Sequence, residues 1–122
     1  MHAIGAVALA VFLVVVGIAH FALPGYFRTL VPSWLPGPGL LVAVSGAAEI
    51  VIGGLILFPA TRATGGWAAA ALISGYVVTW LDILHTARAG SPSLLRRRPA
   101  AFAAVVVNVG YVAWALFVAT GG

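Results

Sequence analysis

The chain has 122 residues, of which only eight are charged: six Arg, one Asp and one Glu. Another 15 residues are Gly, and 63% belong to the hydrophobic set. A water-soluble domain carries charge on about a quarter of its residues, so this composition excludes an ordinary soluble enzyme. It also excludes a disordered chain, because disorder goes with low hydrophobicity and high net charge. The length allows one domain, residues 1–122, whose solvent is mostly lipid.

Four apolar blocks of about 20 residues each are separated by Pro, Gly and Arg. A helix of that length, at ~1.5 Å rise per residue, crosses a ~30 Å hydrocarbon core. The blocks are apolar on every face, which favours spans over surface helices, and they lack the alternating polarity of a membrane β-barrel. No basic residue precedes the first block except a histidine, so we interpret it as a span and not as a cleaved signal. We predict an all-α membrane protein, a four-transmembrane-helix bundle with spans over Ala3–Leu23, Gly39–Phe58, Thr64–Thr86 and Pro99–Ala119.

The arginines predict the orientation of this bundle. The first and third loops carry Arg28, Arg88 and Arg96–Arg98, whereas the second loop carries only Arg62. Because cytoplasmic loops are enriched in Arg, we expect these two loops in the cytoplasm and both termini outside. Arginines on so apolar a chain are better explained by topology than by nucleic acid, which we do not expect as a partner. Arg without Lys, with abundant Ala, Gly and Val, is typical of a GC-rich bacterial genome, and we therefore expect a bacterial inner membrane.

The first loop, residues 24–38, is rich in proline and aromatic residues. The prolines prevent a continuing helix, and the aromatic rings suit the headgroup region. We predict a short interfacial or slightly re-entrant segment over one end of the bundle. Its residues Pro32, Trp34 and Pro36 would serve there as an anchor, which we favour, or as a lid.

Polar side chains inside the predicted spans all lie in one half of the bundle. Glu49 is ~15 Å into the second span, and Asn108 enters the fourth span from the same side to ~13 Å. His20 lies near the end of the first span, and Asp82 and His85 lie near the end of the third. Ionisable groups within spans are costly and indicate function by default. We therefore predict one polar pocket that opens toward the first loop.

Helical spacing adds two wall residues to this pocket, Ser45 four residues before Glu49 and Tyr111 three residues after Asn108. The full predicted set is His20, Ser45, Glu49, Asp82, His85, Asn108 and Tyr111. Three interpretations compete: a hydrogen-bond network that fixes helix packing, a site for a quinone, lipid or other small apolar molecule, and a metal or haem site. Cys is absent, we predict no metal site, and a haem held by two histidines would require His20 and His85 to face each other.

Small residues recur at helical spacing on the second and third spans, including Gly46, Gly53, Gly65 and Gly66. Such positions let helix backbones approach closely in lipid. We predict that they pack helices within one chain, and a homo-oligomer remains an alternative.

Three segments resemble the DoxX-like family of small bacterial membrane proteins. They are GIAHF at residues 17–21 with VPSWLPGP at residues 31–38, SGAAEI at residues 45–50 followed by Gly53, and Pro59 with Thr61 and Arg62. The resemblance covers roughly the first half of the chain. His20, Glu49 and the loop residues Pro32, Trp34 and Pro36 correspond to the family pattern, whereas Asp82 and His85 do not.

The resemblance implies a four-helix integral membrane protein, and some relatives are membrane subunits of quinone-linked sulfur-compound oxidation or of redox-associated complexes. We predict a subunit that is not an enzyme on its own and that binds a quinone, lipid or small apolar ligand, with a membrane or redox protein as partner. The alternative is a structural or assembly factor whose intramembrane polar residues serve helix packing.

Overall fold

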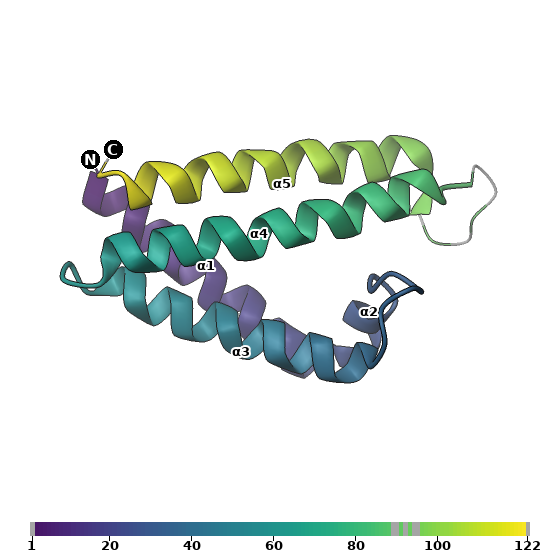
Figure 1. Ribbon diagram of the computed structural model, residues 1–122, viewed down its shortest axis with the longest axis horizontal. Coiled ribbons are helices and arrows are strands. Elements are labelled where there is room, and N and C mark those ends of the chain that lie inside the picture. The colour runs from purple at the N-terminus through teal and green to yellow at the C-terminus, as the bar shows by residue number, and fades with distance from the viewer. Residues whose placement is uncertain (1, 89–90, 92, 94–95, 122) are drawn as a thin grey trace.

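The computed structural model describes residues 2–88, 91, 93 and 96–121, and in these parts of the chain the regular structure is helical. The elements are α1 (His2–Ala22), α2 (Pro24–Arg28), α3 (Pro38–Leu57), α4 (Arg62–His85) and α5 (Arg98–Ala119) (Figure 1). Four of these helices are long and apolar enough to cross a membrane. The predicted four-helix membrane bundle is therefore confirmed, with boundaries within a few residues of those expected.

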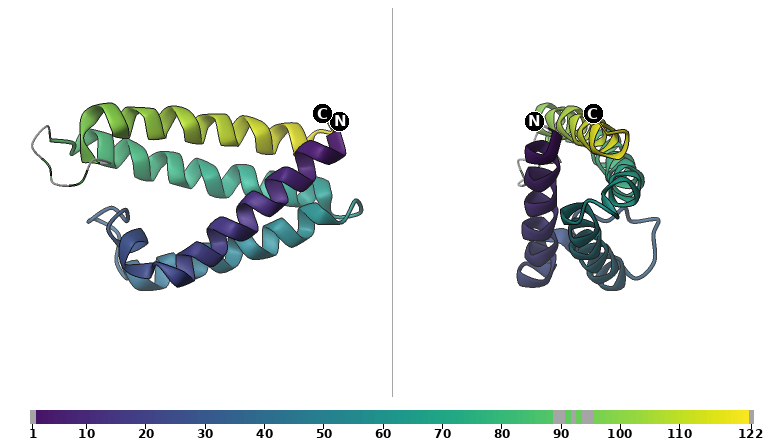
Figure 2. Two further views of the ribbon diagram at one scale, coloured as in Figure 1. Left: turned by 180° about the vertical axis from the view of Figure 1, so that it is seen from behind. Right: turned by 90° about the vertical axis from the view of Figure 1, so that its left-hand side faces the viewer.

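The helices form two antiparallel pairs, α1 with α3 and α4 with α5, which are joined mainly where α3 contacts α4. Figures 1 and 2 show that the pairs converge at the end where both termini lie and diverge toward α2. At the converged end the Trp114 indole donates a hydrogen bond to the Gly5 carbonyl at 3.0 Å, which ties α5 to α1. The bundle is thus closed at one end and splayed at the other.

Glycines set how closely the helices of each pair approach. A Cβ atom on Gly46 of α3 would lie 2.7 Å from the Cβ of His20, and one on Gly17 of α1 would lie 2.8 Å from the Gly46 carbonyl oxygen. A Cβ on Gly66 of α4 would lie 2.6 Å from the backbone nitrogen of Ala119 in α5. The prediction that small residues pack helices within the chain is confirmed at these crossings.

The hydrophobic core occupies the converged half of the bundle. It is built from small and aliphatic residues of all four long helices: Ala6, Leu9, Ala10, Leu13, Ile52, Ile56, Ala69, Ala70, Ile73, Ala115 and Val118. Many large apolar side chains instead point outward, among them Ile4, Val15, Val51 and Phe102. An apolar exterior of this kind is suited to lipid, because a soluble domain would bury such residues.

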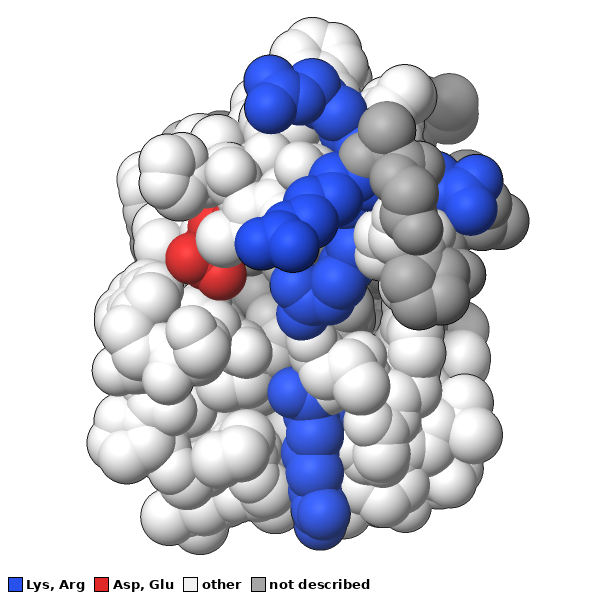
Figure 3. Space-filling view, turned by 90° about the vertical axis from the view of Figure 1, so that its right-hand side faces the viewer, with Lys and Arg blue, Asp and Glu red and all other residues white. Residues whose placement is uncertain are grey.

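The splayed end carries the basic loops. Figure 3 views this end and shows the arginines gathered across it. Arg62 lies at the opposite end, where its guanidinium donates to the carbonyls of Ile56 at 2.9 Å and Leu57 at 3.2 Å. These carbonyls belong to the last turn of α3, where carbonyl groups have no hydrogen-bond partner within the helix. Arg62 therefore caps α3, in addition to any role in the orientation of the bundle in the membrane.

The first loop folds over the splayed end. It contains the short helix α2, which the sequence pattern did not predict, and then reaches α3 through Gly37, whose φ of 63° is in the left-handed region. Pro38 follows in the first turn of α3, where its missing N–H costs nothing. Two contacts attach this loop to the other helix pair: the Trp34 indole donates to Asp82 Oδ1 at 3.1 Å, and the Arg96 guanidinium donates to the Thr29 carbonyl.

Candidate functional site

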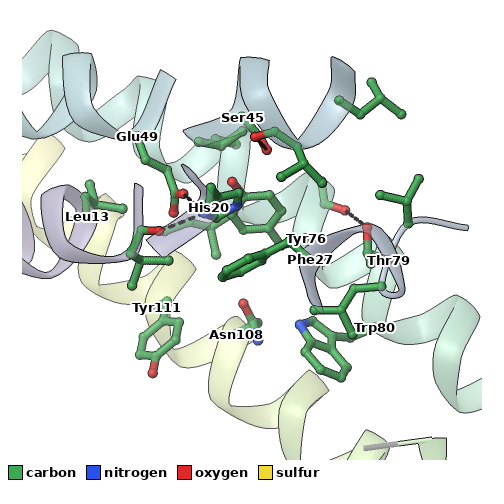
Figure 4. Close-up of a pocket in the computed structure, with 18 of the residues that line it drawn as sticks. Leu13, His20, Phe27, Ser45, Glu49, Tyr76, Thr79, Trp80, Asn108 and Tyr111 are labelled. Carbon is green, nitrogen blue, oxygen red and sulfur yellow. Dashed lines mark hydrogen bonds and ion pairs between the residues drawn. The ribbon is translucent and has the colours of Figure 1, made fainter. Parts of the chain in front are cut away.

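A cavity of ≈ 510 Å³ lies between the two helix pairs in the splayed half of the bundle. Its walls come from α1, α2, the first loop, α3, α4 and α5, and most of the lining is aliphatic or aromatic. Figure 4 shows Ser45 and Glu49 of α3 and His20 of α1 on one side, with Asn108 and Tyr111 of α5 on the other. This volume and this lining suit a small apolar molecule.

The most buried polar residues of the cavity are a histidine and a glutamate on adjoining helices. His20 is 5% exposed and Glu49 is 2% exposed. His20 Nδ1 lies 3.2 Å from Glu49 Oε2 and 2.7 Å from the Val16 carbonyl oxygen, one turn back on α1. Both neighbours of Nδ1 are acceptors, so Nδ1 carries a proton. The close α1–α3 crossing at Gly46 brings the two side chains together.

Aromatic side chains enclose the histidine ring. It stacks on Phe27 of α2, with ring centroids 4.0 Å apart and planes inclined by 16°, and the Tyr76 ring lies 6.4 Å away on α4. The stack joins α2 to α1 at the cavity, because both rings lie in its lining.

Two buried polar atoms in the cavity have no hydrogen-bond partner within the described part of the chain. They are the Tyr76 hydroxyl and Glu49 Oε2, whose contact with His20 Nδ1 at 3.2 Å is an ion-pair distance without hydrogen-bond geometry. The hydroxyl lies close to both Glu49 and Ser45, but without good hydrogen-bond geometry to either. Buried polar atoms in proteins are almost always paired, so these two atoms mark a site where a polar group of another molecule would fit.

Other polar residues of the cavity bond to their own helices. The Ser45 hydroxyl donates to the Val42 carbonyl at 3.1 Å, and the Asn108 amide donates to the Ala104 carbonyl at 2.8 Å. Thr79 donates to the Gly75 carbonyl at 3.4 Å. Their oxygens keep free lone pairs that can accept a hydrogen bond from a ligand.

The structure places five of the seven predicted pocket residues on the cavity wall: His20, Ser45, Glu49, Asn108 and Tyr111. Asp82 and His85 are not in the lining. Asp82 instead accepts the hydrogen bond from Trp34, and His85 is exposed as the last residue of α4. Depth along a helix was the basis for including these two, and depth does not determine which way a side chain points.

The three predicted residues of the first loop differ in their positions. Pro32 is buried and lines the cavity together with Leu30, Val31 and Leu35. Trp34 is 62% exposed and contacts Asp82, and Pro36 is exposed. Part of the loop therefore closes the cavity from above, while Trp34 holds its edge against α4.

Sequence reasoning missed the aromatic lining, including Tyr26, Phe27, Tyr76 and Trp80. It assigned the aromatic residues of the first loop to the headgroup region and did not consider those of α4. Helical spacing contained a usable signal, since Tyr76 lies three residues before Thr79, another polar residue of α4 that lines the cavity.

Within the described ranges, no group of three or more His, Asp or Glu side chains is placed to hold a metal ion. His85 lies outside the cavity that contains His20, so these two histidines are not arranged to hold a haem between them.

Comparison with known proteins gives a family but no activity. Residues 9–119 match the family pattern of a domain of unknown function, DUF8561. The chain belongs to this family. No curated protein and no solved structure matches the chain.

Proposed function

We propose that this multi-pass membrane protein binds a small apolar molecule with a polar head in the cavity between its helix pairs, and that it does so as a non-catalytic subunit of a redox-associated membrane complex. The observation that carries the proposal is the Glu49 carboxylate, which is 2% exposed and has an oxygen without a hydrogen-bond partner among the described residues. A quinone or a lipid has the required shape, with an apolar body and a polar head.

A network that served packing alone would pair its own polar atoms, because each buried unsatisfied group costs about 1–3 kcal/mol. Glu49 and Tyr76 leave such atoms beside an open cavity. A bound head group would satisfy them and offset that cost. This difference favours ligand binding over the alternative, a structural or assembly factor.

The redox association rests on the resemblance of the first half of the chain to the DoxX-like family. His20 and Glu49, which that resemblance includes, are also the two most buried polar residues of the cavity. The site is proposed to lie in a bacterial inner membrane, with the arginine-rich end in the cytoplasm, as the distribution of arginines favours.

In this proposal the first loop controls access. Leu30, Val31 and Pro32 cover the cavity, and the Trp34–Asp82 and Arg96–Thr29 hydrogen bonds hold the loop against the α4–α5 pair. Both contacts are exposed, so each of them contributes little to holding the loop closed. Their release would let a ligand enter from the interface.

Native mass spectrometry of the full chain, gently solubilised from its membrane, tests the proposal. Wild type is expected to carry a bound small molecule that Glu49→Gln and His20→Ala lose. The matched control is Asp82→Asn, which makes the same carboxylate-to-amide change outside the cavity and keeps an acceptor for Trp34. If Glu49→Gln and His20→Ala retain the wild-type ligand content and only unfold more easily, the two residues serve packing and do not hold the ligand. If wild type itself carries no small molecule, ligand binding is contradicted.

A further inference from the structure

The polar atoms around Glu49 are mostly acceptors. When ionised, its carboxylate only accepts hydrogen bonds, and the Ser45 proton is already donated to the Val42 carbonyl. His20 directs its Nδ1 proton at the Val16 carbonyl, and its contact with Glu49 Oε2 at 3.2 Å is an ion-pair distance without hydrogen-bond geometry. The Tyr76 hydroxyl is therefore the one side-chain donor of the described neighbours of Glu49 whose proton is uncommitted.

An anionic head group does not fit this environment. None of the described lining residues is an arginine, so a carboxylate or phosphate would meet Glu49 with only His20 to offset the repulsion. A head group that only accepts hydrogen bonds fits poorly as well. It would occupy the Tyr76 proton and leave the carboxylate oxygen without a partner, at the full desolvation cost of a buried charged group.

We propose, as a refinement that rests on the function proposed above, that the cavity selects ligands whose head group donates a hydrogen bond to Glu49. The chemical class is an apolar molecule that ends in a hydroxyl or an amine. A hydroxyl suits an ionised Glu49 beside a protonated His20, a pair whose charges cancel. An ammonium suits an ionised Glu49 beside a neutral His20, and the rings of Phe27 and Tyr76 near this pair would also favour it. For a quinone-type ligand, the inference selects the reduced quinol, which has O–H groups, over the quinone, which has carbonyls.

The test compares four probes with the same ten-carbon chain: decan-1-ol, decylamine, 1-methoxydecane and decanoic acid. The full chain is studied in lipid nanodiscs, and binding is followed by tryptophan emission, because Trp80 lines the cavity. The emission change of the Gly75→Leu variant serves as the background signal, which comes from partition of the probes into the lipid. Gly75 lines the cavity, and a Cβ atom at this position would meet no side chain or neighbouring helix within 4 Å. A leucine there therefore adds bulk in open space at the cavity wall without displacing a helix.

Wild type is expected to bind the alcohol at least about tenfold more tightly than its methyl ether, which is the range for a hydrogen bond to a charged group, and to bind the acid most weakly. The order of alcohol and amine then identifies the head group as neutral or cationic, and either order supports donation to Glu49. In Glu49→Gln the preference for alcohol over ether is expected to shrink to about twofold or less, because the glutamine amide can itself donate to the ether oxygen.

The inference is overturned if the ether or the acid binds wild type as tightly as the alcohol, or if Glu49→Gln keeps the full preference. Tyr76→Phe provides a second variant should Glu49→Gln fail to fold. It is expected to retain the alcohol preference, and loss of that preference would assign selection to Tyr76 and contradict the inference. If no probe binds above the Gly75→Leu background, the proposed function itself fails. If the probes bind but the alcohol is not preferred over the ether, only the selection of hydrogen-bond donors fails.

Discussion

The two ends of the bundle are made from the same four long helices but from different residues. The converged end is packed with Ala, Gly and aliphatic side chains, and its helices touch. The splayed end is lined by aromatic and polar side chains, and the two helix pairs stand apart there around a cavity of ≈ 510 Å³. In lipid, apolar burial does not by itself drive helices together. The comparison teaches that small residues let the helix pairs meet at the converged end, whereas aromatic side chains line the space between the pairs at the splayed end.

The largest effect that tests this difference between the two ends is expected when the same substitution is made at each end. Gly66→Leu is expected to destabilise the fold by about 3 kcal/mol or more, at the upper end of overpacking costs, because its Cβ would lie 2.6 Å from the Ala119 backbone nitrogen. Gly75→Leu is expected to leave thermal stability close to that of wild type. Thermal unfolding in detergent, followed by circular dichroism, measures both. Equal destabilisation by the two leucines would show that the ends do not differ as described.

A smaller effect is expected from removing the histidine on the cavity floor. His20→Ala loses the contact with Glu49 and the stack on Phe27, and we expect about 2 kcal/mol of destabilisation from these two losses together. The control is Ile18→Ala on the same helix, whose side chain is exposed. Stability is measured as above, and an Ile18→Ala effect as large as that of His20→Ala would contradict a specific role for the histidine.

The smallest effect on stability is expected at the contact that fastens the first loop. Asp82→Ala removes the acceptor for Trp34 and should cost about 1 kcal/mol or less, as exposed polar contacts do. Its main consequence should be faster ligand exchange, seen as a higher dissociation rate of a bound probe in stopped-flow tryptophan fluorescence. Asp82→Asn keeps an oxygen acceptor and should restore the slow rate. Unchanged exchange in Asp82→Ala would mean that this contact does not gate the cavity.

Much of the fold followed from the sequence because lipid imposes simple requirements. Each span must be long, apolar and helical, and composition alone locates such segments to within a few residues. Depth arguments also placed His20, Glu49 and Asn108 in the same half of the bundle. The tight crossings at Gly46 and Gly66 were anticipated for the same physical reason, since only small residues let backbones meet.

The rest of the site depended on direction, which one-dimensional spacing does not supply. Thr79 and Asp82 lie three residues apart on α4, yet Thr79 lines the cavity and Asp82 accepts a hydrogen bond from Trp34 outside it. The helix α2 and the stack of Phe27 on His20 depend on a loop that folds back over the bundle. Tyr76 was overlooked because a tyrosine in a span is ambiguous until its hydroxyl is seen beside Glu49.

A crystal structure of the protein grown from a lipid phase, without added ligand, tests the central claim most directly. The account predicts elongated density between the helix pairs, with a polar end within about 3 Å of Glu49 Oε2 and an apolar body along the wall formed by Leu72 and Ile73. A closed cavity, in which the Glu49 carboxylate is paired only with His20 and Tyr76 and no other molecule is present, would contradict it.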